Sequence, residues 1–108
     1  MAVDSEQAVA ALSALAHESR LAVFRMLIQQ GPDGLSAGDL ADHLGIQPPV
    51  LSFHLAQLSR TRLVISQRCG RSIIYTPNFE TMDELMAYLN ENCCKGIPHT
   101  STPKTGRH

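Results

Sequence analysis

Gly45 and the proline pair that follows it constrain the fold more than any other part of this chain. Ser36, with Asp39 three residues later, predicts the start of a short helix that ends at Gly45. Pro48 and Pro49 can occupy the first turn of the next helix, where their missing N–H groups cost little. Two helices joined by a tight glycine turn are typical of a helix-turn-helix, whose second helix can cross the major groove of DNA.

The segments around this helix pair predict three more helices and a β-hairpin. The helical patterns are those of Ser5–Ala16, of the segment that follows a break at residues 17–19 and ends at Gly31, and of Met82–Asn90. Strand patterns at residues 63–68 and 72–76 flank Gly70, the expected turn residue. This order predicts a mainly α fold with a β-hairpin wing, a winged helix-turn-helix. The alternative is an αα-hairpin inside an ordinary helical domain, which a hairpin with arginine on both sides of its turn disfavours.

Charge is distributed unevenly along the chain, although the formal net charge is only −1. The segment from His43 to Phe79 contains no Asp or Glu, whereas the following residues 80–94 are acidic. The arginines of the acid-free segment are Arg60, Arg62, Arg68 and Arg71. Several arginines without acids are typical of a surface that faces phosphates, and the alternative is a merely solvated face.

Length and cysteine content limit the domain organisation and the compartment. The 108 residues suit one domain, which dimerisation would help to stabilise. We divide the chain into residues 1–92, a DNA-binding and dimerisation domain, and residues 93–108, a vicinal-cysteine segment with a flexible tail. Three cysteines cannot form a complete set of disulfides, which favours a reducing compartment. We expect a cytoplasmic protein, since the sequence shows no signal-peptide pattern and no apolar run of roughly 18 residues.

The adjacent cysteines Cys93 and Cys94 follow the last predicted helix. A disulfide between neighbours has difficult geometry, but two thiolates can bind one soft, thiophilic centre together. The polar neighbours Asn92 and Lys95 indicate that the pair is not part of a core, although two small apolar residues at a helix end remain the alternative. Cys69, at the predicted hairpin turn, is a candidate third ligand or simply a small residue at a strand end.

Three segments of the chain carry motifs that point to one known family. Residues 12–21 (LSALAHESRL) are similar to an "ALADPTRL" stretch, residues 51–55 (LSFHL) to a "VSHHL" recognition helix, and residues 70–75 (GRSIIY) to a "GRxxxY" wing. Together these segments resemble the ArsR/SmtB family of metal- and metalloid-responsive repressors. The resemblance covers roughly residues 8–92. It implies a homodimer built through the first and last helices, which binds an imperfect palindrome in the promoter of its own operon.

The predicted recognition helix and wing supply the candidate DNA contacts. Gln47, Ser52 and His54 lie on or at the start of this helix, where polar side chains can reach base edges or phosphates. For His54, burial within the fold is an alternative of equal weight. The phosphate or minor-groove candidates are Arg60, Arg62, Arg68 and Arg71; for the first two, solubility of a helix end is the alternative.

Most sensing sites of the family are missing from this sequence. The family's "CxC" arsenic site has no thiol counterpart in residues 35–40, and residues 82–89 lack the histidines of its zinc site. Cys93 and Cys94 resemble a branch of arsenic repressors with adjacent cysteines after the last helix, but the third cysteine of that branch is absent. Two thiolates suit methylarsenite as well as arsenite, and antimonite is a further candidate. A zinc site completed by His99 is disfavoured, because adjacent ligands strain a tetrahedral geometry.

The sequence therefore predicts an arsenic(III)-responsive repressor of an arsenic-resistance operon, which binds promoter DNA as a dimer. It requires no cofactor, and trivalent arsenic is its expected inducer. One alternative is a thiol redox or persulfide sensor on the same scaffold. Another is a winged-helix module that binds proteins instead of DNA. We do not expect an enzyme, because the sequence offers no Gly-rich phosphate loop and no nucleophile with an obvious base.

Overall fold

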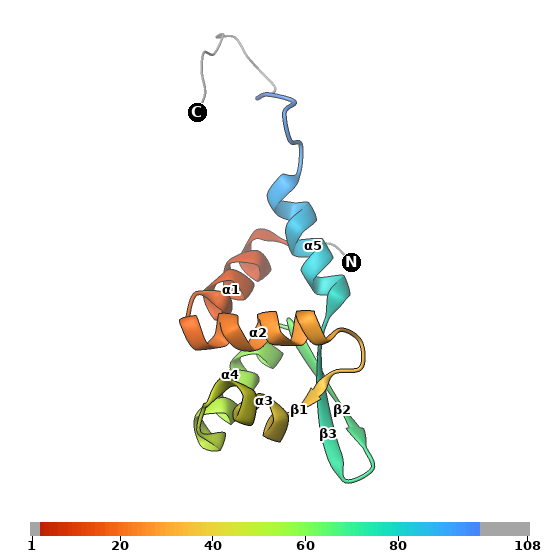
Figure 1. Ribbon diagram of the computed structural model, residues 1–108. Helices are drawn as coiled ribbons and strands as arrows, with labels where there is room; N and C mark the ends of the chain where they lie inside the picture. The colour runs from red at the N-terminus through yellow and green to blue at the C-terminus, as the bar shows by residue number, and fades with distance from the viewer. Residues whose placement is uncertain (1–2, 98–108) are drawn as a thin grey trace.

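The computed structural model describes residues 3–97, and its elements follow the order of a winged helix-turn-helix (Figure 1). Within these residues the helices are α1 (Ser5–Leu15), α2 (Glu18–Gln30), α3 (Ala37–Leu44), α4 (Pro48–Arg60) and α5 (Phe79–Asn90). The strands are β1 (Leu35–Ser36), β2 (Val64–Cys69) and β3 (Ser72–Pro77). No helix in this part of the chain is long and apolar enough to span a bilayer. His99 and the predicted tail beyond Ile97 lie outside the described residues.

α3 and α4 form the helix-turn-helix, and local chemistry defines their ends. The Ser36 hydroxyl accepts a hydrogen bond from the backbone N–H of Asp39 at 3.1 Å, which caps α3. Gly45 ends α3 with a φ of 65°, a left-handed conformation that glycine adopts without steric cost. Pro48 and Pro49 fill the first turn of α4. The predicted helix-turn-helix is therefore confirmed.

β2 and β3 form the hairpin of the wing, and β1 extends it to an antiparallel sheet in the order β1-β3-β2. Gly70 has a φ of 65° and forms the two-residue turn with Arg71, where a positive φ suits the twist of the strands. β1 was not predicted; it pairs with Tyr75 and Ile74 of β3. Gly34, just before β1, has a φ of 71°, and a Cβ there would lie 2.6 Å from the Tyr75 carbonyl oxygen. The backbone just before β1 and α3 therefore lies directly against β3 of the wing.

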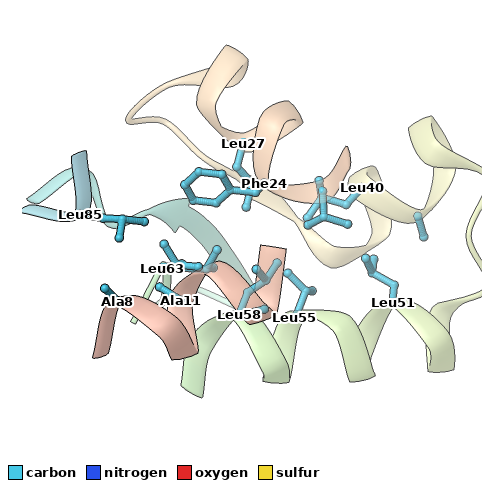
Figure 2. Packing of buried hydrophobic residues seen from close by; sticks show 14 residues of the cluster. Ala8, Ala11, Phe24, Leu27, Leu40, Leu51, Leu55, Leu58, Leu63 and Leu85 are labelled. Carbon is cyan, nitrogen blue, oxygen red and sulfur yellow. The ribbon is translucent and has the colours of Figure 1, made fainter. Parts of the chain in front are cut away.

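The hydrophobic core joins the helices to the base of the wing (Figure 2). Leu27 of α2, Leu40 of α3 and Leu58 of α4 are fully buried, and α5 adds Leu85. α1 packs closely through small side chains, namely Ala8, Ala11 and Ala14. One face of α4 is thus fixed on the core, so its opposite face is presented to solvent.

α5 begins earlier than predicted. The sequence placed its start near Met82, whereas the helix begins at Phe79. The side chain of Asn78 accepts a hydrogen bond from the backbone N–H of Thr81 at 3.3 Å. Asparagine is a favoured N-cap residue, and here it directly follows Pro77, the last residue of β3. The wing therefore leads into α5 without a loop.

Candidate functional site

α4 has a buried face and an exposed face. Leu51, Leu55 and Leu58 are buried and hold the helix against the core. Gln47, the N-cap residue, makes no side-chain capping bond, and both Gln47 and Ser52 are exposed. In a DNA-binding helix-turn-helix, the N-terminal part of the second helix contacts base edges. The two polar side chains lie where such contacts are made.

The exposed face of α4 also carries two large apolar side chains that the sequence analysis did not single out. Val50 is 48% exposed and Phe53 is 57% exposed. The sequence could have predicted the exposure of both residues, because neither belongs to the apolar stripe formed by Leu51, Leu55 and Leu58. An apolar residue outside the stripe of an amphipathic helix has no core position to fill.

His54 is only 5% exposed, which corrects the prediction that it contacts bases and favours the alternative of burial within the fold. Its ring packs against that of His17, with 4.8 Å between the ring centroids. His17 is the N-cap of α2, and its Nδ1 accepts the backbone N–H of Ser19 at 3.2 Å. α2 therefore begins at Glu18, and the predicted break at residues 17–19 is shorter than expected.

Burial and nearby positive charge keep the His54 imidazole neutral. Burial lowers the pKa of His54 below its ordinary value of 6.5, and the charges of His17 and Arg20 lower this pKa further. The Arg20 Nε–H donates a hydrogen bond to the Ala14 carbonyl at 2.7 Å, which fixes the guanidinium in place. Nδ1 of His54 is buried without a hydrogen-bond partner. A proton on His54 would add a positive charge in a buried site close to the Arg20 guanidinium.

We expect acid to destabilise the fold through His54. Because the pKa of His54 is lower in the folded protein, the unfolded chain binds more protons between that value and about 6.5. The free energy of unfolding should fall as the pH drops below about 6.5 and level off below the folded pKa. Urea titrations of wild type and His54→Leu, at about pH 7.5 and 5.5, measure this loss. The His54→Leu variant should lose less stability than wild type over this range.

The matched control for this pH effect is His43→Leu. His43 is exposed on α3, where its ring contacts the Asp39 carbonyl at 2.9 Å. This variant should keep the pH dependence of wild type. An unchanged pH dependence in the His54 variant would mean that the buried imidazole does not control acid stability.

The four predicted arginines are exposed, and they form two groups at opposite ends of the wing. Arg68 and Arg71 lie at the tip, in β2 and in the turn. Arg60 and Arg62 lie at the base, where α4 ends and before β2 begins. Six residues of β2 span about 20 Å between the two groups. One continuous row of four arginines is therefore not formed.

Arg62 faces a cavity of about 450 Å³ between α1, the end of α4 and the start of α5. Glu80 and Glu84 line the same cavity. Arg62 therefore lies at the base of the wing beside α1 and α5, away from the wing tip. The wing-tip arginines are the better candidates for phosphate contacts.

The three cysteines do not meet within one chain. Cys69 ends β2 at the tip of the wing, whereas Cys93 and Cys94 follow α5 (Figure 1). The wing tip and the end of α5 lie at opposite ends of the domain in this view. This placement corrects the interpretation of Cys69 as a third ligand from the same chain.

A turn after α5 brings the two neighbouring thiols together. The Sγ atoms of Cys93 and Cys94 are 2.8 Å apart, and both residues are exposed and free of disulfide bonds. Neighbouring side chains of an extended segment would point to opposite sides. Here Asn92 and Cys94 have φ values of 59° and 69°, and the Cys93 N–H donates to the Asn90 carbonyl at 2.9 Å. A left-handed conformation is unusual for cysteine, so this arrangement of the thiols is maintained against a local backbone cost.

The hydrogen bond with Cys94 raises the pKa of the Cys93 thiol above its ordinary value, and desolvation adds to this shift. Among residues 3–97, no group of three or more His, Cys, Asp or Glu side chains could hold a metal ion. The candidate zinc site with His99 falls outside the described residues. The thiol site within the described residues therefore consists of two sulfur atoms, those of Cys93 and Cys94.

The helix-turn-helix and its three-stranded wing define a winged-helix DNA-binding domain. Residues 15–67 match the model of a family described as a helix-turn-helix domain. The chain is 36% identical over 90 residues to the HTH-type transcriptional regulator YgaV of Escherichia coli (strain K12), which covers 83% of this chain and 89% of YgaV. It is 32% identical over 95 residues to the transcriptional activator HlyU of Vibrio cholerae, covering 88% of this chain and 85% of HlyU. These similarities show that the chain belongs to the ArsR/SmtB family of DNA-binding transcriptional regulators, a family of regulators and not of enzymes.

Solved structures agree with this family assignment. The structure of reduced HlyU from Vibrio cholerae has a TM-score of 0.62 at 34% identity, covering 83% of this chain and 92% of that one. An ArsR-like transcriptional regulator from Rhodococcus sp. RHA1 has the same fold, with a TM-score of 0.74 at 24% identity. That match covers 83% of this chain and 82% of the Rhodococcus chain. Family membership leaves the inducer to be inferred from the site itself.

Proposed function

We propose that this chain is an arsenic(III)-responsive repressor of an arsenic-resistance operon. It binds promoter DNA in the cytoplasm as a homodimer and leaves the DNA when trivalent arsenic binds Cys93 and Cys94. The observation that carries the proposal is the pair of exposed sulfur atoms, 2.8 Å apart, at the end of α5. Thiolates select soft centres, and trivalent arsenic is such a centre.

Ligand exchange at arsenic needs only the two thiols. Methylarsenite carries one methyl and two hydroxyl groups on arsenic. Each thiol forms one S–As bond and displaces one hydroxyl, which leaves as water with the thiol proton. The arsenic stays trivalent, and no oxidant or reductant is consumed. Arsenite would keep its third hydroxyl, so two sulfurs satisfy methylarsenite fully and arsenite in part; antimonite follows the same exchange.

The second candidate function is that of a thiol redox or persulfide sensor. It is supported by the similarity to HlyU, whose reduced form has a solved structure. A disulfide between neighbouring residues is strained. This strain opposes formation of a Cys93–Cys94 disulfide and favours the arsenic proposal.

In the proposed complex, the exposed face of α4 enters the major groove. Gln47 and Ser52 reach base edges, and Arg68 and Arg71 of the wing tip contact phosphates or the minor groove. α1 and α5 form the dimer contact, which would place the two α4 helices about one DNA turn, roughly 34 Å, apart. The operator is accordingly an imperfect palindrome.

We expect Arg71→Ala to weaken DNA binding to a similar degree on all sequences. A phosphate contact contributes through counterion release, so the slope of log affinity against log salt should become shallower by about 0.9 per lost contact. Fluorescence anisotropy at several salt concentrations measures both quantities. Arg62→Ala is the matched control and should leave affinity and slope near those of wild type. An unchanged slope in the Arg71 variant would mean that the wing tip does not contact the DNA phosphates.

Release from DNA tests the arsenic proposal directly. The protein is bound to a fluorescent promoter fragment under excess phosphine reductant and titrated with methylarsenite, and in parallel with a polysulfide in the absence of reductant. We expect release by one arsenical per protomer under the reducing condition. Release by polysulfide alone would replace the arsenic proposal with the redox alternative.

A further inference from the structure

Two large apolar side chains of α4 lie outside the core, and the only ring contact of Phe53 among residues 3–97 is an edge-on contact with His54, with 6.0 Å between the ring centroids. Val50 and Phe53 are 48% and 57% exposed, although Leu51 and Leu55 beside them are buried in the core. Residues three apart on a helix lie on the same face, so Val50 and Phe53 form one small apolar patch. This patch occupies the N-terminal half of α4.

The charge around the patch indicates which partner it meets. The segment from His43 to Phe79 contains α4 and the wing and has no carboxylate side chain. Arg68 and Arg71 at the wing tip add positive charge. An acid-free, arginine-bearing segment suits a polyanion, and in a DNA-binding helix-turn-helix the N-terminal half of the second helix is the part that approaches base edges.

We propose that Phe53, with Val50 beside it, packs against thymine methyl groups in the major groove and contributes to operator specificity. The C5-methyl of thymine is the apolar group that a base pair presents there, and phenylalanine is one of the side chains that contact it. Gln47 and Ser52 supply polar contacts on the same exposed side of the helix. The inference rests on the DNA binding in the proposed function and is independent of the arsenic response.

Replacement of single thymines by uracil tests this contact. Deoxyuridine lacks only the methyl group and keeps the pairing edge and the O4 acceptor. A preferred DNA sequence is first selected from a randomised pool, and each thymine of one half-site is then replaced in turn. We expect wild type to lose about fourfold in affinity at one or two positions, the effect of one buried methyl group. Phe53→Ala should bind the thymine and uracil forms of those sites equally.

Two controls separate the methyl contact from a general loss of binding. Phe53→Leu keeps an apolar side chain and should retain part of the discrimination. Phe79→Ala removes an exposed phenyl ring from α5 and should retain all of it. Thermal unfolding verifies that each variant is folded.

The possible outcomes are distinct. Wild type that is indifferent to uracil at every position, or a Phe53→Ala variant that keeps full discrimination, overturns the inference and assigns the patch to another partner. Failure to select any DNA sequence overturns both this inference and the proposed function. Selective DNA binding with methyl discrimination but without release by arsenicals overturns only the arsenic proposal.

Discussion

Cys93→Ser and Cys94→Ser should each bind operator DNA as wild type does and fail to release it when methylarsenite is added. The two sulfur atoms lie after α5, away from α4 and the wing tip, so neither substitution touches the proposed DNA surface (Figure 1). A serine hydroxyl does not provide the soft sulfur ligand that arsenic requires. One remaining thiol leaves only one S–As bond, which is easily exchanged for water.

Anisotropy titration of the DNA complex with methylarsenite and with arsenite measures this loss of response. We expect the midpoint for release to rise at least about tenfold, which corresponds to a loss of about 1.4 kcal/mol in the binding free energy of the arsenical. The matched control is Cys69→Ser, which removes an exposed cysteine from the wing and should respond as wild type does. Full response in both vicinal variants would place the sensor elsewhere in the chain.

The coupling between arsenic and DNA must also be reciprocal. If arsenic weakens DNA affinity by some factor, operator DNA weakens arsenic affinity by the same factor. Arsenic titrations of the wild-type protein with and without DNA provide this second measurement. Equal arsenic affinities in the two titrations would contradict an allosteric release mechanism.

Leu89→Glu should convert the protein to a monomer and reduce operator affinity by about a hundredfold or more. Met86 and Leu89 of α5, with Val9 and Leu12 of α1, are large apolar side chains exposed on the single chain. Burial of such side chains between two protomers stabilises a dimer by about 1.5–3 kcal/mol for each one fully buried. A carboxylate at this surface would be desolvated without a partner, which opposes association.

Analytical ultracentrifugation with and without DNA measures the oligomeric state. Leu21→Glu is the matched control, because Leu21 is an exposed leucine of α2 and lies outside the α1 and α5 surface. We expect this control to remain dimeric. A wild-type monomer at micromolar concentration, both alone and on DNA, would contradict the proposed dimer.

Local signals explain why the helix-turn-helix was predictable from sequence. Ser36, Gly45 and Pro48 each act within one helical turn, so their effect does not depend on distant residues. The N-terminus of α5 was mistaken because Asn78 and Thr81 are both good capping residues. Which of the two caps the helix depends on where the preceding strand ends, and in the structure β3 ends at Pro77, directly before Asn78.

Features that depend on tertiary contacts were predicted less well. β1 has two residues, and it is a strand only because β3 lies beside it. The burial of His54 was visible in part, since His54 is three residues after Leu51 and four before Leu58, which places it on the core side. Its contact with His17 joins elements far apart in the sequence, and no local pattern predicts that contact. The separation of Cys69 from Cys93 and Cys94 also depends on tertiary structure, because the wing and α5 extend in different directions from the core.

The direct junction between β3 and α5 has a mechanical consequence. Asn78 is the single residue between the two elements, and its N–H donates to the Leu63 carbonyl at 2.8 Å. A connection of one hydrogen-bonded residue restricts the angle between β3 and α5. β3 is in turn paired with β1, which runs directly into α3. α5, the wing and the helix-turn-helix are therefore joined in series without a flexible linker.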